Sequence, residues 1–172
     1  LEKLRASGAV KAIGVGVNEA EMCARFARAG DFDVMMLAGR YSLLEQGALT
    51  EFLPLALEKK IAVMLAGVFN SGILATGAKP GAFYNYKPAP PEVLARVARI
   101  EAVCASHGVA LPQAALAFCA AHPAVATIVL GAVTPQEVAR NLDLVARPVP
   151  AALWRELKAE GLLAEAAPVP AA

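Results

Sequence analysis

The chain has 172 residues and a formal net charge of +1, from 16 Lys and Arg against 15 Asp and Glu, which argues against a nucleic-acid binder that relies on bulk positive charge. Apolar residues make up 58% of the chain and charged residues 18%, whereas soluble domains usually carry about 25% charged residues. So much apolar material excludes disorder for most of the chain, and the length suits one domain.

Four short apolar runs are predicted to form buried strands. Each is apolar throughout rather than alternating with polar residues, which is typical of parallel strands covered on both faces. Because helical patterns separate the runs, the sequence predicts an α/β protein whose parallel sheet is either open or closed into a barrel. Four strands of a barrel would leave two edge strands unpaired, which favours association with a partner or a second copy. The runs are residues 10–17, 34–37, 61–65 and 126–130.

The helices are predicted from start signals, stop signals and apolar spacing. Asn18 followed by Glu21 is a capping pattern. Thr134, Pro135 and Glu137 form the strongest helix start, with proline at the first helical position. In chain order the predicted helices cover residues 18–29, 47–59, 91–107, 111–121, 134–147 and 151–160.

Residues 66–90 are predicted to form one long loop rich in Gly, Pro, Asn and Tyr. A loop of that length inside a compact domain is usually functional. We expect residues 1–163 to belong to one domain and residues 164–172, rich in Ala and Pro, to form a flexible tail. The chain begins at Leu1 without an initiator Met or the apolar stretch of a signal peptide, so we expect it to start inside a larger protein.

Two runs without charged residues, 61–78 and 102–136, raise the question of a membrane span. A spanning helix needs about 20 mostly apolar residues. Glycine and asparagine interrupt the first run, and histidine, glycine and proline interrupt the second. No membrane span is therefore predicted.

The three cysteines do not make a disulfide framework, which favours a reducing compartment and hence the cytoplasm. Two C-x-x-H pairs, Cys104 with His107 and Cys119 with His122, have a spacing that could build a tetrahedral zinc site from two helix faces. Both histidines, however, stand at predicted helix ends, where they interact favourably with the helix dipole. We therefore predict no metal site.

Ligands of parallel α/β proteins gather at the carboxyl ends of the strands. Four glycine-containing segments follow those ends here, and glycine lets a backbone approach a ligand closely. The helix starts at Asn18 and Thr134 offer free N–H groups and a positive dipole end, which suit phosphate. Gly14-Val15-Gly16 alone lacks the third glycine and the ribose-binding acid of a dinucleotide fingerprint. The segments are residues 14–18, 38–42, 66–72 and 131–134.

Six stretches in order cover nearly the whole chain and carry a family resemblance. They are VKAIGVGVN (10–18), FDVMMLAGRYSLLEQ (32–46), VFNSGILATG (68–77), FYNYKPAPPEV (83–93), HGVALPQAALAF (107–118) and HPAVATIVLGAVTPQEVARNL (122–142). The set resembles the C-terminal half of the aldo-keto reductase superfamily, and within it the D-threo-aldose 1-dehydrogenase (L-fucose dehydrogenase) group. The pyridoxal 4-dehydrogenase group is a close relative that these motifs do not exclude.

The resemblance implies strands five to eight, with their helices, of a (β/α)₈ TIM barrel that binds NAD(P) without a Rossmann loop. It implies that Asn18 binds the nicotinamide carboxamide, that the loop after the third strand wraps the pyrophosphate, and that the segment after the fourth strand holds the adenosine. The implied cofactor-binding residues are Asn18, Gly67, Phe69, Asn70, Ser71, Gly72, Gly131, Val133, Thr134, Glu137 and Asn141. Phe83, Tyr84 and Tyr86 are implied to form part of the sugar pocket.

Two departures from the family pattern affect the cofactor. Ala66 stands where many members carry a tyrosine that stacks on the nicotinamide, so that Phe69 or no residue takes this role. Val133 and Thr134 stand where NADP-preferring members often have a basic residue, and a 2′-phosphate would need Arg or Lys there. The nearest candidate is Arg140, so we expect NAD as the cofactor, with NADP as the alternative.

The family's catalytic tetrad of Asp, Tyr, Lys and His lies on the first four strands, and no residue of this chain matches it. We therefore expect no catalytic residue here, and the missing N-terminal half of the barrel as a partner. The parent protein would oxidise C1 of an aldose to a lactone by hydride transfer to the cofactor. Two alternatives remain open: a stand-alone half-barrel that binds nucleotides or assembles without catalysis, and an unrelated four-stranded α/β binding protein.

Overall fold

The computed structural model describes residues 1–171. A sheet of four strands in the order β1-β2-β3-β6 lies at its centre, and all three pairings are parallel. The predicted parallel α/β arrangement is therefore confirmed. The strands are β1 (Gly14–Val17), β2 (Val34–Ala38), β3 (Ala62–Ala66) and β6 (Val125–Val129).

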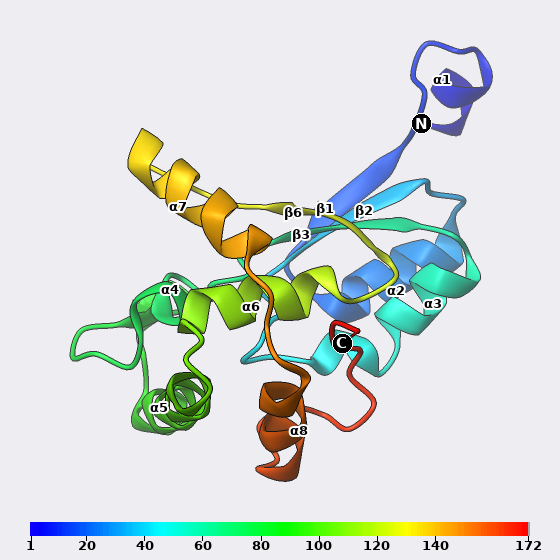
Figure 1. Ribbon diagram of the computed structural model, residues 1–172. Coiled ribbons are helices and arrows are strands. Elements are labelled where there is room, and N and C mark those ends of the chain that lie inside the picture. The colour runs from blue at the N-terminus through cyan, green and yellow to red at the C-terminus, as the bar shows by residue number, and fades with distance from the viewer. Residues whose placement is uncertain (172) are drawn as a thin grey trace.

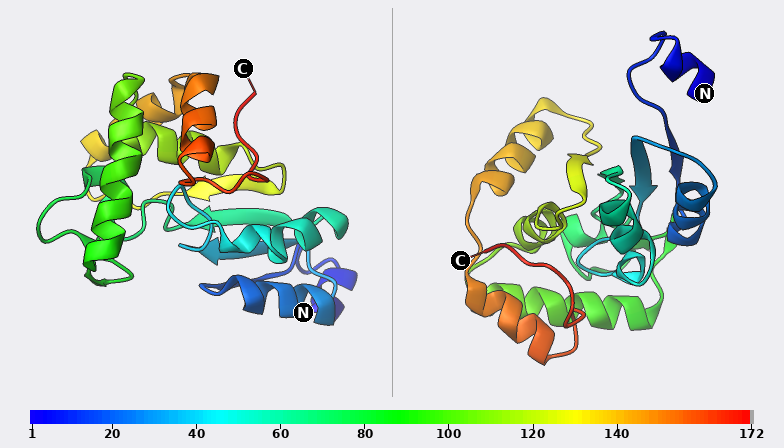
Figure 2. Two further views of the ribbon diagram at one scale, coloured as in Figure 1. Left: turned by 90° about the horizontal axis from the view of Figure 1, so that it is seen from below. Right: turned by 90° about the vertical axis from the view of Figure 1, so that its right-hand side faces the viewer.

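The helices gather mainly on one face of this sheet. Figure 1 shows α2, α3 and α6 beneath the strands, and in both views of Figure 2 α5 and α8 lie side by side, farther from the sheet. The helices are α1 (Glu2–Ala6), α2 (Ala20–Ala29), α3 (Phe52–Glu58), α4 (Ile73–Thr76), α5 (Pro91–Ser106), α6 (Leu111–Ala120), α7 (Pro135–Ala146) and α8 (Ala151–Ala159), with a 3₁₀ turn at Gly47–Leu49.

One face of the sheet is buried and the other is open. In β2 and β3 alternate residues are completely buried, among them Met35, Leu37, Val63 and Leu65. The residues between them are only partly buried, because nothing in residues 1–171 covers the second face. The prediction that the strands are covered on both faces therefore holds for only one face of the sheet within residues 1–171.

Local signals predicted some helix boundaries well and others poorly. At α7 the Thr134 hydroxyl accepts a hydrogen bond from the Glu137 N–H at 3.2 Å, which confirms the predicted cap. The Glu137 carboxylate accepts from the N–H of Val133, the residue before the cap, at 2.9 Å. At α2 the cap position is Glu19 and no side chain caps the helix, so the prediction for Asn18 was wrong.

Two predicted segments contain more structure than expected. The predicted helix 47–59 divides into the 3₁₀ turn and α3, which places Pro54 in the first turn of α3, where its missing N–H costs nothing. The long loop 66–90 contains α4 and a hairpin of β4 (Phe83–Tyr84) and β5 (Lys87–Pro88). This hairpin contributes to the site described below.

The end of the described chain packs on the core. Leu162, Leu163 and Ala167 are buried, and the Ala164 N–H donates to Gln46 Oε1 at 3.3 Å. The domain boundary at residue 163 and the flexibility of residues 164–172 remain predictions.

Among residues 1–171 no single helix is long and apolar enough to span a membrane. The helices α5 and α6 reach that length and apolarity only when they are taken together, and they are bent by 95° relative to each other.

His122 should lower the free energy of unfolding in mild acid. It is buried, its Nδ1 accepts a hydrogen bond from the Ala124 N–H at 3.1 Å, and burial lowers its pKa below the ordinary 6.5. The unfolded chain takes up a proton near pH 6.5 while the folded chain does not, so stability is lost as pH falls from about 6.5 towards the folded pKa.

The measurement is urea unfolding of the wild type and His122→Asn at about pH 7.5 and about pH 5.5. The asparagine oxygen can accept the same hydrogen bond without titrating. We expect the variant to lose less free energy of unfolding between the two pH values. An identical loss in both proteins would show that His122 is not the source.

Candidate functional site

A polar cavity of about 210 Å³ opens where β2 and β3 end, and we call it the Arg40 cavity. Its wall combines the loop after β1, the loops after β2 and β3, and the β4–β5 hairpin. Residues from all of these segments therefore meet at the carboxyl edge of the sheet, as the topology requires. They include Asn18, Gly39, Arg40, Asn70, Ser71, Asn85 and Tyr86.

A second cavity of about 460 Å³ lies between the loop after β3 and the start of α7, and we call it the Asn141 cavity. Its wall includes Phe69, Gly72, Gly131, Glu137, Arg140 and Asn141. The two cavities share Gly67, Asn70, Ser71 and Tyr86. Together they offer space for one elongated, two-part ligand that crosses the loop after β3.

The shared wall is a loop held in left-handed backbone conformations. Asn70, Ser71 and Gly72 have φ values of +46°, +59° and +96° in succession. Gly67 has φ +63°, and a Cβ there would lie 3.1 Å from the backbone nitrogen of Gly39, so a residue with a side chain would be strained at this position. The Ser71 N–H donates to no acceptor within residues 1–171 and is available to a ligand.

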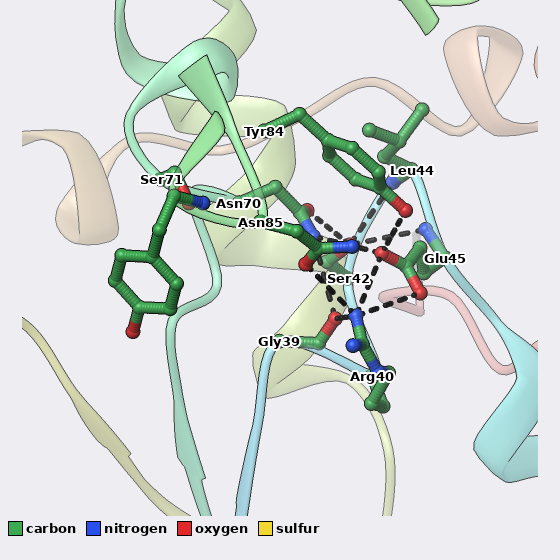
Figure 3. A network of polar contacts seen from close by, with 10 residues as sticks. Gly39, Arg40, Ser42, Leu44, Glu45, Asn70, Ser71, Tyr84 and Asn85 are labelled. Carbon is green, nitrogen blue, oxygen red and sulfur yellow. Dashed lines mark hydrogen bonds and ion pairs between the residues drawn. The ribbon is translucent and has the colours of Figure 1, made fainter. Parts of the chain in front are cut away.

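A network of polar contacts fixes this loop to its neighbours (Figure 3). The buried Asn70 accepts a hydrogen bond from the Ser42 hydroxyl at 2.6 Å and donates to the Gly39 carbonyl at 3.3 Å and to Glu45 at 3.4 Å. Such a satisfied buried network holds one geometry, because each partner it lost would leave a polar group unpaired.

Glu45 also ties the hairpin to the loop after β2. Its carboxylate accepts a hydrogen bond from the Tyr84 hydroxyl at 2.5 Å and from Arg40 Nη1 at 3.3 Å. Arg40 Nη1 donates in addition to the Asn85 side chain at 3.0 Å. The hairpin is thus held over the Arg40 cavity by side chains that lie 39 to 45 positions earlier in the chain.

The Asn141 cavity contains one unpaired polar atom. Asn141 is 6% exposed, and its Oδ1 has no hydrogen-bond partner among residues 1–171. A buried polar atom without a partner is costly, unless a ligand supplies one. This oxygen therefore fits a ligand that brings an N–H or O–H donor to α7.

The structure brings most of the expected cofactor residues to these two cavities. Asn18, Gly67, Phe69, Asn70, Ser71, Gly72, Gly131, Glu137 and Asn141 all line one or both. Val133 is 89% exposed and Thr134 is occupied as the cap of α7, and neither lines a cavity.

The three expected sugar-pocket residues belong to one hairpin but do not line a cavity together. Tyr86 lines both cavities, Phe83 is half exposed, and Tyr84 is occupied with Glu45. Sequence reasoning did not single out Arg40, Glu45 or Asn85. Arg40 lies in the strand-end segment 38–42, and Asn85 lies between the residues expected for the sugar pocket, but nothing local marks Glu45.

Neither Tyr41 nor Tyr84 suits acid–base chemistry. Burial raises the pKa of Tyr41, and burial together with the Glu45 hydrogen bond raises the pKa of Tyr84 to about 12. An acid–base tyrosine needs the opposite shift, towards neutral pH.

The histidines and cysteines of the C-x-x-H pairs do not converge. His107 Nε2 lies 2.7 Å from Glu156 Oε2, His122 bonds the backbone, and all three cysteines are free and buried. In the part of the chain that the structure describes, no group of three or more His, Cys, Asp or Glu side chains could hold a metal ion.

The aldo/keto reductase family model matches residues 1–160. The chain is 43% identical over 158 residues to D-threo-aldose 1-dehydrogenase of a Pseudomonas species, a match of 91% of this chain and 48% of the relative. It is 40% identical over 163 residues to pyridoxal 4-dehydrogenase of Microbacterium luteolum, a match of 95% and 48% respectively. The chain thus spans about half the length of the curated relatives it matches.

Solved structures agree on the fold. An aldo-keto reductase from Bacillus halodurans in its holo form matches with a TM-score of 0.70 and 24% identity, over 96% of this chain and 54% of that one. The glycerol dehydrogenase of Gluconobacter oxydans matches with a TM-score of 0.65 and 18% identity, over 99% and 54%. These matches confirm the expected fold class, a partial (β/α)₈ barrel, and together with the family model they show that the chain belongs to the aldo-keto reductase family.

Proposed function

We propose that this chain is the cofactor-binding half of an NAD(P)-dependent dehydrogenase that oxidises C1 of an aldose, such as L-fucose, to a lactone. The observation that carries the proposal is the pair of cavities joined along the loop after β3. A dinucleotide is an elongated ligand of two nucleotides joined by a pyrophosphate, and this arrangement suits it. The aldose dehydrogenase relative supports the substrate class.

The residues present fit the two ends of such a cofactor. Asn18 would hold the nicotinamide carboxamide at the Arg40 cavity, and the loop with Gly67 and Ser71 would hold the pyrophosphate. Asn141, with its unpaired oxygen, would receive a donor from the adenosine end. When bound, the cofactor accepts a hydride from the substrate, and the chain's own residues orient it and exclude water around it.

We infer NAD rather than NADP as the preferred cofactor. Val133 and Thr134, at the start of α7, carry no charge that could meet a 2′-phosphate. Arg140 lines the Asn141 cavity and is the nearest basic residue, so it is the position from which NADP could still be accepted.

The catalytic tetrad would lie in an N-terminal half of the barrel that pairs with this chain. Within the described residues the outer edges of β1 and β6 have no partner strand. Beside β6, the residues Val138, Leu142 and Val145 form an exposed apolar stripe along α7, with exposed fractions of 49%, 67% and 56%. Such a stripe is expected where another layer of the barrel packs.

The test compares this chain with the complete gene product that contains it. Each is incubated with NAD or NADP and L-fucose or related aldoses, and NADH or NADPH formation is followed by absorbance. We expect activity in the complete product and none in the chain alone. Activity of the short chain would contradict the location of the tetrad, and no activity of the complete product with any aldose would contradict the substrate class.

Pyridoxal is a second candidate substrate, because pyridoxal 4-dehydrogenase of Microbacterium luteolum matches at 40% identity. It belongs in the same assay as a separate arm. Turnover of pyridoxal without turnover of aldoses would replace the proposed substrate. Cofactor binding without turnover of either would favour the non-catalytic half-barrel.

Asn141→Leu should weaken NAD binding about 5- to 30-fold, since it removes an acceptor that the ligand would use inside a buried site. The measurement is a calorimetric titration of the complete gene product with NAD. Gln136→Leu is the matched control, because Gln136 is also an amide on α7, is exposed, and lines neither cavity. Unchanged affinity in Asn141→Leu would place the adenosine elsewhere.

A further inference from the structure

Arg40 is a charged side chain at a polar site to which neither the family pattern nor the comparisons assign a role. Among the described residues that line the Arg40 cavity, it is the only charged one. Its side chain is 34% exposed, so it is held by the protein but still accessible. The other polar side chains of this wall are three amides and two hydroxyls, all of them neutral, so Arg40 is the group that an anionic part of a ligand in this cavity would meet.

The protein holds the Arg40 guanidinium group at Nη1 and leaves its other two nitrogens without a partner in the described chain. Nη1 donates to the Asn85 side chain at 3.0 Å, to Glu45 at 3.3 Å and to the Gly39 carbonyl at 3.4 Å. Figure 3 shows these contacts converging on one nitrogen. Nη2 and Nε donate to no acceptor within residues 1–171. Three N–H donors of a planar, oriented group therefore remain for a ligand.

The Arg40 side chain can still bind an anion, although the Glu45 carboxylate lies beside it. Its carboxylate also accepts hydrogen bonds from Tyr84 and Asn70, so its negative charge is shared among three donors. Its contact with Arg40 is long, at 3.3 and 3.5 Å, rather than the short bidentate pair of a strong ion pair. Glu45 and Asn85 thus fix the orientation of the Arg40 guanidinium group through their contacts with Nη1.

We propose that Arg40 is a further cofactor-binding residue, which donates through Nη2 and Nε to the phosphate oxygens on the nicotinamide side of the dinucleotide. The inference rests on the proposed function, and it adds a positive charge to a cavity whose other lining side chains are neutral. Arginine matches phosphate geometry with two parallel N–H donors. The free Ser71 N–H, in the left-handed turn that lines the same cavity, supplies another donor for the same group.

The test uses the complete gene product and three probes titrated by calorimetry: AMP, nicotinamide mononucleotide and ADP-ribose. Arg40→Met keeps much of the side-chain length and removes the charge. We expect affinity for ADP-ribose and nicotinamide mononucleotide to fall about 10- to 100-fold, as expected for loss of charged hydrogen bonds, and affinity for AMP to change less than about twofold. Arg40→Lys, with charge but no planar fork, should lie between.

Arg25→Met is the matched control, because Arg25 lies exposed on α2 and its side chain forms no ion pair and no hydrogen bond except to Met22 within the described chain. It changes net charge equally and should leave all three affinities unchanged. Thermal unfolding of each variant checks the fold, and Arg40→Gln, which can still donate to Asn85, replaces Arg40→Met if that variant unfolds.

The outcomes separate two failures. If the wild type binds none of the probes, the proposed function falls and this inference falls with it. If the wild type binds them and Arg40→Met binds them equally well, only the role of Arg40 is overturned. A higher KM for the aldose in Arg40→Met, with cofactor affinities unchanged, would also overturn it and would make Arg40 a substrate-binding residue.

Discussion

Gly14→Ala should destabilise the fold by about 3 kcal/mol or more and lower Tm by roughly 6–12 °C. Gly14 begins β1 and stands opposite Val34 in the parallel pairing with β2. A Cβ added to it would lie 2.0 Å from the Val34 carbonyl oxygen and 2.9 Å from the Val34 carbonyl carbon. Both atoms belong to the backbone, so the clash is relieved only if the two strands separate.

Gly16→Ala is the matched control for this substitution. Gly16 lies on the same strand, two residues along, and its nearest neighbour would be Met36 Cβ at an ordinary 3.5 Å. It should change Tm by less than about 3 °C. Urea and thermal unfolding of both variants, followed by circular dichroism, make the comparison. Equal stability of the two variants would mean that β1 does not pair tightly with β2.

Trp154→Ala should cost about 3–5 kcal/mol, the usual loss when a large aromatic side chain is removed from a core. Trp154 is the only tryptophan, is 1% exposed, and joins α8 to α6 through Phe118, with ring centroids 6.4 Å apart. Its loss would leave a cavity between the outer helices and the layer that covers the sheet.

Trp154→Phe should cost much less, under about 1.5 kcal/mol. Trp154 Nε1 is buried without a partner in the described chain, so phenylalanine removes an unpaired N–H along with part of the volume. Urea unfolding by circular dichroism measures both variants, since neither keeps the tryptophan fluorescence. A similar cost in both variants would show that the smaller phenylalanine ring does not fill the space that the indole occupies.

The sheet could be predicted from the sequence because its signal is local. Each apolar run is bounded by glycines and helix patterns, and the structure has a strand within or across each of them. The Thr134 cap was predictable for the same reason, since its partners lie within three residues. The division of the helix at 47–59 could have been anticipated from Pro54.

The candidate site was only half predictable. The glycine-containing segments at strand ends predicted a ligand site at the edge of the sheet where the two cavities lie. The contacts that shape the edge, however, join residues far apart in the chain, such as Ser42 with Asn70 and Arg40 with Asn85. No periodicity or motif reports such pairs, because they exist only once the strands are placed side by side.

The shared wall between the two cavities has a consequence for ligands smaller than a dinucleotide. Gly67, Asn70, Ser71 and Tyr86 line both cavities, and the hydrogen bonds of Asn70 already hold the loop of this wall in one geometry. Neither of two fragments, an adenine nucleotide and a nicotinamide nucleotide, therefore has to order the wall for the other. Each should bind with an affinity that hardly depends on the other, because a wall that is already ordered gives the two sites little coupling free energy.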